Sequence, residues 1–290
     1  METCNKEKGN KNKRIWKKPG AAFLLALFLG LTAIGTASCG QPPQDAAEEQ
    51  PPEPEQTEEP AGMEEAEPEE EPQETAEEVP GQTGELQSLI DMGVPIPEKE
   101  VDFEELRENV NEDIYAWIYI PDSKIDYPIV QHPIDNFYYL NYNLDGSYGY
   151  PGCIYTERYN RKDFADPLTV VYGHNMKNGT MFAGLHDYED IEYFREHPYV
   201  YVYTPEKLYV YEIFASHEYG NEHLLYNHDY AVKSEFRKYV DSILELRSMN
   251  SNRAEDVEVT EDSHILVLST CMANKPDNRY LVQGVLLNED

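Results

Sequence analysis

The last 200 or so residues of the chain consist largely of short β-branched and aromatic runs separated by turn signals. The eight runs are Tyr115–Ile120, Ile125–Val130, Cys153–Thr156, Leu168–Tyr172, Tyr199–Tyr203, Leu208–Ser216, Ile265–Ser269 and Tyr280–Leu287. Many short strands of this kind favour a sheet that closes on itself, because closure removes exposed strand edges. The sequence therefore predicts a mainly β domain that forms an eight-stranded, closed or nearly closed barrel.

Apolar residues recur with helical spacing in three places around these runs. Two short segments, Leu86–Met92 and Val101–Asn111, precede the first run, and a longer one, Ala231–Met249, lies between the sixth and seventh runs. The longer segment has an apolar stripe opposite a charged face, which predicts a helix that covers the barrel wall. The expected fold is a barrel with N-terminal helices and one long helix inserted before the seventh run, Ile265–Ser269, which leads to Cys271.

The first 40 residues have the composition of an export or anchoring segment. Residues 1–18 carry seven basic and two acidic side chains, and Ala21–Ala37 is free of charge. This pattern is typical of a secretory signal or a short membrane anchor whose basic end stays in the cytoplasm. Small residues before Cys39 also resemble a bacterial lipobox, so an uncleaved anchor and a lipid on Cys39 are alternatives. Both predict an extracellular domain held at the cell membrane.

An acidic segment separates this region from the β-rich domain. Residues 41–80 contain 16 acidic residues, nine prolines and no Lys or Arg. Such a segment cannot bury enough apolar surface to offset its chain entropy, which predicts a disordered spacer. We therefore divide the chain into residues 1–40, a linker at 41–84 and a folded domain at 85–290.

The charge and cysteine content of the folded domain exclude several functions. Residues 85–290 carry 16 basic and 38 acidic groups, a net charge of −22. This domain lacks the basic surface expected for binding nucleic acid or anionic lipid. Since no CxxC motif or His/Cys ligand spacing occurs, neither a metal nor another cofactor is expected. Cys153 is expected to pack as a strand residue.

Three residues at junctions of runs and loops can perform acyl chemistry. The seventh run leads to Cys271, the fourth run leads to His174, and Arg279 opens the eighth run. A thiol nucleophile, an imidazole base and a guanidinium together can combine covalent catalysis with stabilisation of developing charge. The sequence therefore predicts a Cys/His/Arg site.

The other seven histidines lack a comparable position. His264 lies seven residues before Cys271 at the far end of the same run, about 20 Å away by strand rise, and His217 at a strand end is a weaker reserve. The remaining five are His132, His186, His197, His223 and His228.

These residues and the motifs around them resemble the sortases, cysteine transpeptidases of Gram-positive cell surfaces, and in particular class B. Besides Arg279, the matching segments are Tyr172–Met176 (YGHNM), Leu268–Cys271 (LSTC), Ala116–Pro121 (AWIYIP), Ile125–Gln131 (IDYPIVQ), Tyr138–Leu140 (YYL), Gly152–Tyr155 (GCIY) and Glu196–Tyr201 (EHPYVY). The resemblance runs from about residue 97 to the end. It implies an eight-stranded β-barrel preceded by helices, which agrees with the periodicity.

The resemblance also implies a mechanism. Cys271 would attack the carbonyl of a threonine in a C-terminal sorting signal and form a thioester, and an amine would resolve it. His174 would act as general acid and base, and Arg279 would stabilise the oxyanion or hold the substrate. The implied partners are surface proteins with a sorting signal, and an amine of a peptidoglycan precursor or a pilin.

The same resemblance assigns four residues to the sorting-peptide groove. Asn136 and Leu140 match an Asn-x-x-x-Leu pattern, and Ser269 and Thr270 precede the nucleophile.

Two alternative functions stay open at this point. A hydrolytic surface cysteine peptidase would use the same thioester and resolve it with water. A membrane-tethered binding module without catalysis would use the many tyrosines, 23 in all, for binding and would leave the His and Cys incidental. Most of these tyrosines fall in strand runs, where packing explains them.

Overall fold

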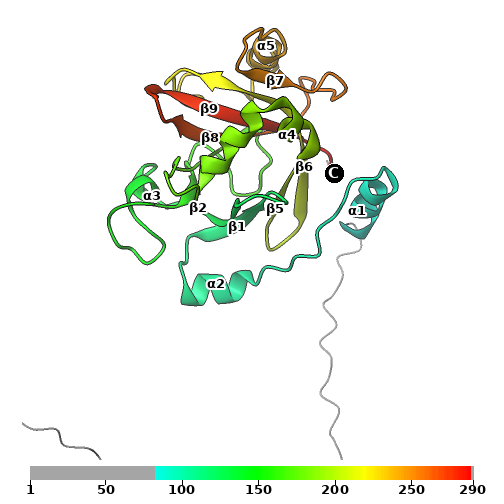
Figure 1. The fold of residues 1–290 in the computed structure, drawn as a ribbon. Helices are drawn as coiled ribbons and strands as arrows, with labels where there is room; N and C mark the ends of the chain where they lie inside the picture. The colour runs from blue at the N-terminus through cyan, green and yellow to red at the C-terminus, as the bar shows by residue number, and fades with distance from the viewer. Residues whose placement is uncertain (1–81, 289–290) are drawn as a thin grey trace, which may run out of the picture. The chain divides into compact units, whose positions relative to one another are not determined.

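Nine strands form one sheet in the computed structural model, which describes residues 82–288 (Figure 1). The strands are β1 Ile114–Tyr119, β2 Asp126–Val130, β3 Ile154–Thr156, β4 Leu168–Tyr172, β5 Tyr199–Tyr203, β6 Leu208–Tyr219, β7 Ser251–Arg253, β8 Ile265–Met272 and β9 Lys275–Leu286. Their order is β5-β1-β2-β3-β4-β8-β9-β6-β7, and β5 also pairs with β6. That last pairing closes eight strands into a barrel and leaves β7 as a short addition to β6. The predicted eight-stranded barrel is confirmed.

The barrel interior is an apolar cluster to which each of the eight strands contributes. Members from successive strands are Ile118, Ile129, Ile154, Val171, Val202, Ile213, Leu268 and Val282. In β8, Leu266 and Leu268 belong to this cluster, whereas Ile265 and Val267 belong to a second cluster outside the barrel. Both faces of β8 are therefore buried, which explains why its sequence is continuously apolar and does not alternate.

The helices are α1 Gln82–Asp91, α2 Phe103–Asn109, α3 Tyr138–Asn141, the 3-10 helix η1 Phe182–Glu189, α4 Ile191–Glu196 and α5 Lys233–Leu244. α1 and α2 correspond to the predicted N-terminal helices. The side chain of Asp102 caps α2 by accepting from the Glu105 N–H at 2.8 Å. α5 corresponds to the predicted inserted helix, and it buries Phe236, Val240 and Ile243 in the cluster that covers β8.

Two strand boundaries near Cys271 differ from the prediction. β8 continues to Met272, and β9 begins at Lys275, five residues before the predicted Tyr280. The polar residues at the start of β9 pair with β8 and β6, so backbone pairing and not hydrophobicity defines this part of the strand. Cys271 is the penultimate residue of β8, close to the predicted strand end, whereas Arg279 lies inside β9, so the prediction that Arg279 opens its strand is wrong.

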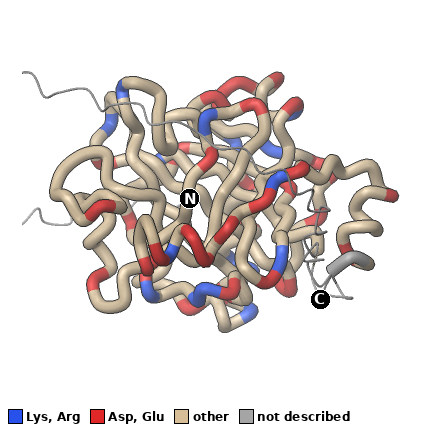
Figure 2. The backbone as a smooth tube through the Cα atoms, turned by 90° about the horizontal axis from the view of Figure 1, so that it is seen from below, with Lys and Arg blue, Asp and Glu red and all other residues tan. Residues whose placement is uncertain are grey.

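The N-terminal predictions fall largely outside the described residues. The anchor at residues 1–40, including Cys39, and the linker up to residue 81 belong to that part. α1 begins at Gln82, so residues 82–84 of the predicted linker are helical. Across residues 82–288, no helix combines the length and the hydrophobicity that a membrane crossing needs. Acidic positions outnumber basic ones in the described part, and the basic ones are scattered (Figure 2).

Candidate active site

Parallel pairing of β4 and β8 brings His174 and Cys271 to the same edge of the barrel. The last aligned pair is Tyr172 and Ser269. His174 follows Tyr172 by two residues, and Cys271 follows Ser269 by two. Since parallel strands run in the same direction, their carboxyl ends lead to one edge of the sheet. The register explains how residues far apart in the sequence become neighbours.

The β8–β9 hairpin adds Arg279 to this edge. Cys271 and Arg279 are directly opposed in the antiparallel register. Directly opposed residues project from the same face of a sheet, so the thiol and the guanidinium share a face. Arg279 Nη1 donates to the carbonyls of Pro276 and Asn278 at 3.1 and 3.2 Å, which ties the guanidinium to the backbone at the start of its own strand.

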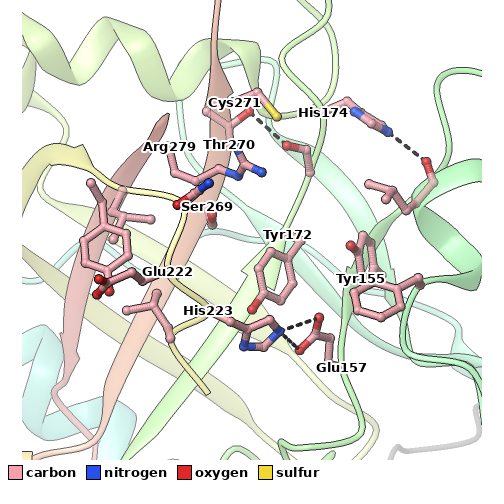
Figure 3. Close-up of a pocket in the computed structure, with 17 residues that line it drawn as sticks. Tyr155, Glu157, Tyr172, His174, Glu222, His223, Ser269, Thr270, Cys271 and Arg279 are labelled. Carbon is pink, nitrogen blue, oxygen red and sulfur yellow. Dashed lines mark hydrogen bonds and ion pairs between the residues drawn. The ribbon is translucent and has the colours of Figure 1, made fainter. Parts of the chain in front are cut away.

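The His174 ring is fixed by a hydrogen bond and a ring contact. Its Nε2 lies 2.8 Å from the Leu140 carbonyl oxygen, and because a carbonyl can only accept, Nε2 carries a proton. The Tyr150 ring meets the imidazole edge-on, with centroids 5.1 Å apart. In the neutral ring, Nδ1 is therefore the nitrogen that can accept a proton. The Cys271 sulfur points toward His174 in Figure 3, and within residues 82–288 no hydrogen bond joins the two side chains.

Cys271, His174 and Arg279 line one cavity of about 190 Å³ (Figure 3). Leu140, Ser269 and Thr270, three of the four predicted groove residues, line it as well. The Thr270 hydroxyl also donates to the Gly173 carbonyl at 2.9 Å, which joins the strand of Cys271 to the strand end that carries His174. The cavity is further lined by Phe137, Tyr155, Glu157, Tyr172, Tyr219, Asn221, Glu222, His223, Leu224 and Leu281.

A family model described as the sortase domain matches residues 118–287, more than half of the chain. The chain belongs to the sortase family. Its match to sortase B of Listeria monocytogenes serovar 1/2a is 33% identical over 190 residues, which cover 64% of this chain and 75% of that one. The resemblance to class B sortases is thus confirmed, and the protein is a cysteine transpeptidase.

Solved structures agree with this assignment. Sortase B from Bacillus anthracis has a TM-score of 0.56 and 30% identity, over 67% of this chain and 90% of that one. The sortase B–substrate complex of Staphylococcus aureus shares the fold, with a TM-score of 0.57 at 22% identity over 73% of this chain and 94% of that one.

Asn136 does not line the cavity of this sortase. Its side-chain oxygen accepts from the Arg158 backbone N–H at 3.0 Å. Arg158 in turn donates from Nη1 to the Ile134 carbonyl at 3.0 Å. Asn136 therefore fastens the loop after β3 to the segment before α3, and its contact with substrate stays a prediction.

The end of the sortase cavity away from Cys271 holds an acid–imidazole pair that sequence analysis did not single out (Figure 3). His223 Nε2 lies 3.0 Å from Glu157 Oε1 and 2.9 Å from Oε2. His223 Nδ1 accepts from the Leu225 and Tyr226 N–H groups at 3.2 and 3.0 Å, so Nε2 carries the proton. Burial raises the pKa of Glu157, and the bond from His223 opposes that rise.

Two tyrosines lie between this pair and the nucleophile. The rings of Tyr155 and Tyr172 stack, with centroids 5.4 Å apart. Burial raises the pKa of both phenols, so they stay protonated across the physiological range. The sequence pattern indicates that strand tyrosines serve packing. The position of Tyr172, directly before Gly173-His174, is the signal that places it near the catalytic site.

The two cysteines of the described sortase residues have different surroundings. Cys271 is partly exposed, whereas Cys153 is buried just before β3 and donates from Sγ to the Tyr142 carbonyl at 3.3 Å. Burial raises the pKa of the Cys153 thiol to about 12. Over residues 82–288, no group of three or more His, Cys, Asp or Glu side chains is arranged to hold a metal ion.

Proposed function

We propose that this sortase cleaves a C-terminal sorting signal after threonine through a Cys271 thioester and transfers the protein to a cell-wall or pilin amine. The observation that carries the proposal is the strand register. β4, β8 and β9 present His174, Cys271 and Arg279 at one edge of the barrel, beside a single cavity. This arrangement can place a nucleophile, a group that carries a proton and a cationic hydrogen-bond donor around one substrate carbonyl group.

In the first half-reaction, Cys271 Sγ bonds to the threonine carbonyl carbon while His174 Nδ1 takes the thiol proton. The carbonyl oxygen becomes an oxyanion, which the guanidinium of Arg279 stabilises through its N–H groups. His174 then gives its proton to the leaving amine, the C–N bond breaks and the thioester remains.

In the second half-reaction, an amine attacks the thioester carbon and passes a proton to His174. The C–S bond breaks, and the sulfur recovers its proton from the imidazole. The Leu140 carbonyl supports both halves, because its bond to Nε2–H keeps Nδ1 as the nitrogen that exchanges protons. Leu140, Ser269 and Thr270 would contact the sorting peptide along the cavity wall.

The same proposal sets the domain outside the cell. Residues 1–40 would hold it at the membrane, either as a single anchor or through a lipid on Cys39. The support is the basic stretch followed by 17 uncharged residues, Ala21–Ala37. The acidic residues 41–81 would then separate the barrel from the bilayer.

An acceptor-dependence assay tests the proposed reaction. The full-length protein is incubated with peptides that contain Pro-x-Thr signals, with and without triglycine as the amine. We expect the acyl–amine product to increase with triglycine while the hydrolysed product falls. Cys271→Ala should give neither product, and Cys153→Ala, which removes the other thiol of the domain, should keep both. Hydrolysis that ignores the amine would identify a peptidase, and no cleavage across the peptide set would favour a binding module.

A further inference from the structure

We propose that Asn175, His186 and Glu189 form a clamp on the backbone of Cys271 and act as positioning residues for the nucleophile. This inference rests on the proposed function for its catalytic consequence. The clamp is made of side chains that sequence analysis leaves without a role.

The Cys271 carbonyl needs partners from outside the sheet. The carbonyl of Ser269, two residues earlier, accepts from the Gly173 N–H of the neighbouring segment at 3.1 Å. Carbonyls two residues apart on a strand point to the same side, so the Cys271 carbonyl also points toward the β4 side. β4 has ended at Tyr172, and within the part of the chain that the structure describes no other strand lies there to donate. Asn175 Nδ2 at 2.9 Å and His186 Nε2 at 3.1 Å occupy that place.

His186 is held on three sides. Its Nδ1 lies 2.6 Å from Glu189 Oε1, three residues further along. Its ring stacks on the ring of Tyr280, with centroids 5.2 Å apart and planes at 27°. Its Nε2 also lies 2.9 Å from Asn175 Nδ2. The imidazole therefore has a fixed orientation, although its side chain keeps 22% exposure.

The proton arrangement of the clamp is self-consistent. A carboxylate can only accept, so Nδ1 of His186 donates to Glu189, and Nε2 of the neutral ring accepts one N–H of Asn175. The second N–H of Asn175 donates to the Cys271 carbonyl. A side-chain donor therefore holds the end of β8.

The clamp is linked to each of the three proposed catalytic residues or to its neighbour in the chain, through the Cys271 carbonyl, the Tyr280 ring and Asn175 itself. Asn175 follows His174, Tyr280 follows Arg279, and Cys271 itself supplies the carbonyl. η1, which carries His186, is also joined to His174 by a bond from the Phe182 N–H to the His174 carbonyl at 3.0 Å. Because a misplacement of about 1 Å at a reacting group can cost about 100-fold in rate, loss of the clamp should slow the chemical step.

The test compares His186→Ala, His186→Gln and Glu189→Gln with the full-length parent. Gln can still accept from Asn175 or donate to the Cys271 carbonyl, so it is the conservative variant. His197→Ala is the matched control, because His197 also stacks on a tyrosine, Tyr193, but lies at the end of α4 outside the cavity. The readouts are backbone hydrogen exchange over residues 269–273, and kcat and KM for a sorting peptide.

We expect His186→Ala to speed exchange in that segment and to lower kcat by about tenfold or more, with KM unchanged. His186→Gln should recover most of kcat, and His197→Ala should match the parent. The kcat of Glu189→Gln should lie between those of His186→Ala and His186→Gln. Unchanged exchange, or a rise in KM at constant kcat, would overturn the clamp. If the parent cleaves no sorting peptide, the proposed function fails, and the exchange rates alone then decide for or against the clamp.

Discussion

Cys271 and Arg279 are direct cross-strand partners in the β8–β9 hairpin. The ladder is regular up to this pair, and the register shifts immediately after it, between Cys271 and Met272. Backbone hydrogen bonds therefore hold the nucleophile candidate and the cation together, and a flexible loop does not have to bring them into contact. This relationship makes the role of the guanidinium directly testable.

Arg279→Ala should lower kcat/KM for a sorting peptide by about 100- to 1000-fold, the usual cost of losing an oxyanion donor. Arg279→Lys should recover little, because a point charge lacks the planar fork of donors. Lys275→Ala is the matched control, since Lys275 lies on the same strand, pairs with Glu218 at 2.6 Å and does not line the cavity. A fully active Arg279→Lys variant would mean that a positive charge alone is enough to stabilise the oxyanion, without the guanidinium geometry.

The two cysteines of the domain should differ sharply in reactivity. A thiol with a pKa of about 12 is ionised in about one molecule in 10⁴ at pH 8, so native Cys153 should resist iodoacetamide. We expect peptide mapping to find alkylation at Cys271 in the native protein, and at Cys153 only after unfolding in urea. Alkylation of Cys153 at equal rates in both states would contradict its burial.

His217 should make stability depend on pH. Burial lowers the pKa of His217, whose Nε2 lies 2.8 Å from Gln283 Nε2 and can only accept there. The folded state then binds fewer protons than the unfolded state, so the free energy of unfolding falls as the pH drops below about 6.5.

The measurement is urea unfolding of the parent and His217→Gln between pH 8 and pH 5. The parent should lose up to about 1.4 kcal/mol more per pH unit than the variant in that range. Parallel curves for the two proteins would show that His217 does not titrate differently on folding.

Removal of the α5 anchor should affect stability and leave the chemistry intact. Phe236 is fully buried between α5 and the outer face of the barrel. Phe236→Ala should cost about 3–5 kcal/mol of unfolding free energy, while kcat of the folded fraction stays near that of the parent. Val232→Ala, at the exposed start of the same helix, should change stability by about 0.5 kcal/mol or less. A large loss of kcat in the folded Phe236 variant would contradict the separation of α5 from the site.

Much of the barrel is readable from sequence because apolar runs and turns coincide with its strands. The predicted bounds of β4 and β5 agree with the structure to the residue. β7, Ser251–Arg253, has no apolar residue, and only its pairing with β6 identifies it. The polar start of β9 is missed for the same reason, since a pattern of hydrophobicity cannot report backbone pairing.

The sequence predicts part of the candidate site as well. His174, Cys271 and Arg279 stand out because each is a reactive side chain near a junction of a run and a loop. His186 and His223 do not, because their positions depend on how η1 and the loop after β6 return to the barrel. Asn136 matches a sequence pattern, yet its side chain accepts a hydrogen bond from the backbone of Arg158. The sequence pattern does not predict this local hydrogen bond.

The most direct test of the account is the intact mass of the protein during reaction with a sorting peptide. We predict a transient increase equal to the peptide up to its threonine, mapped to Cys271, absent from Cys271→Ala and discharged faster when an amine is added. A folded protein with a free Cys271 that forms no adduct across a broad set of Pro-x-Thr peptides, or forms it at another residue, would contradict the proposed thioester mechanism.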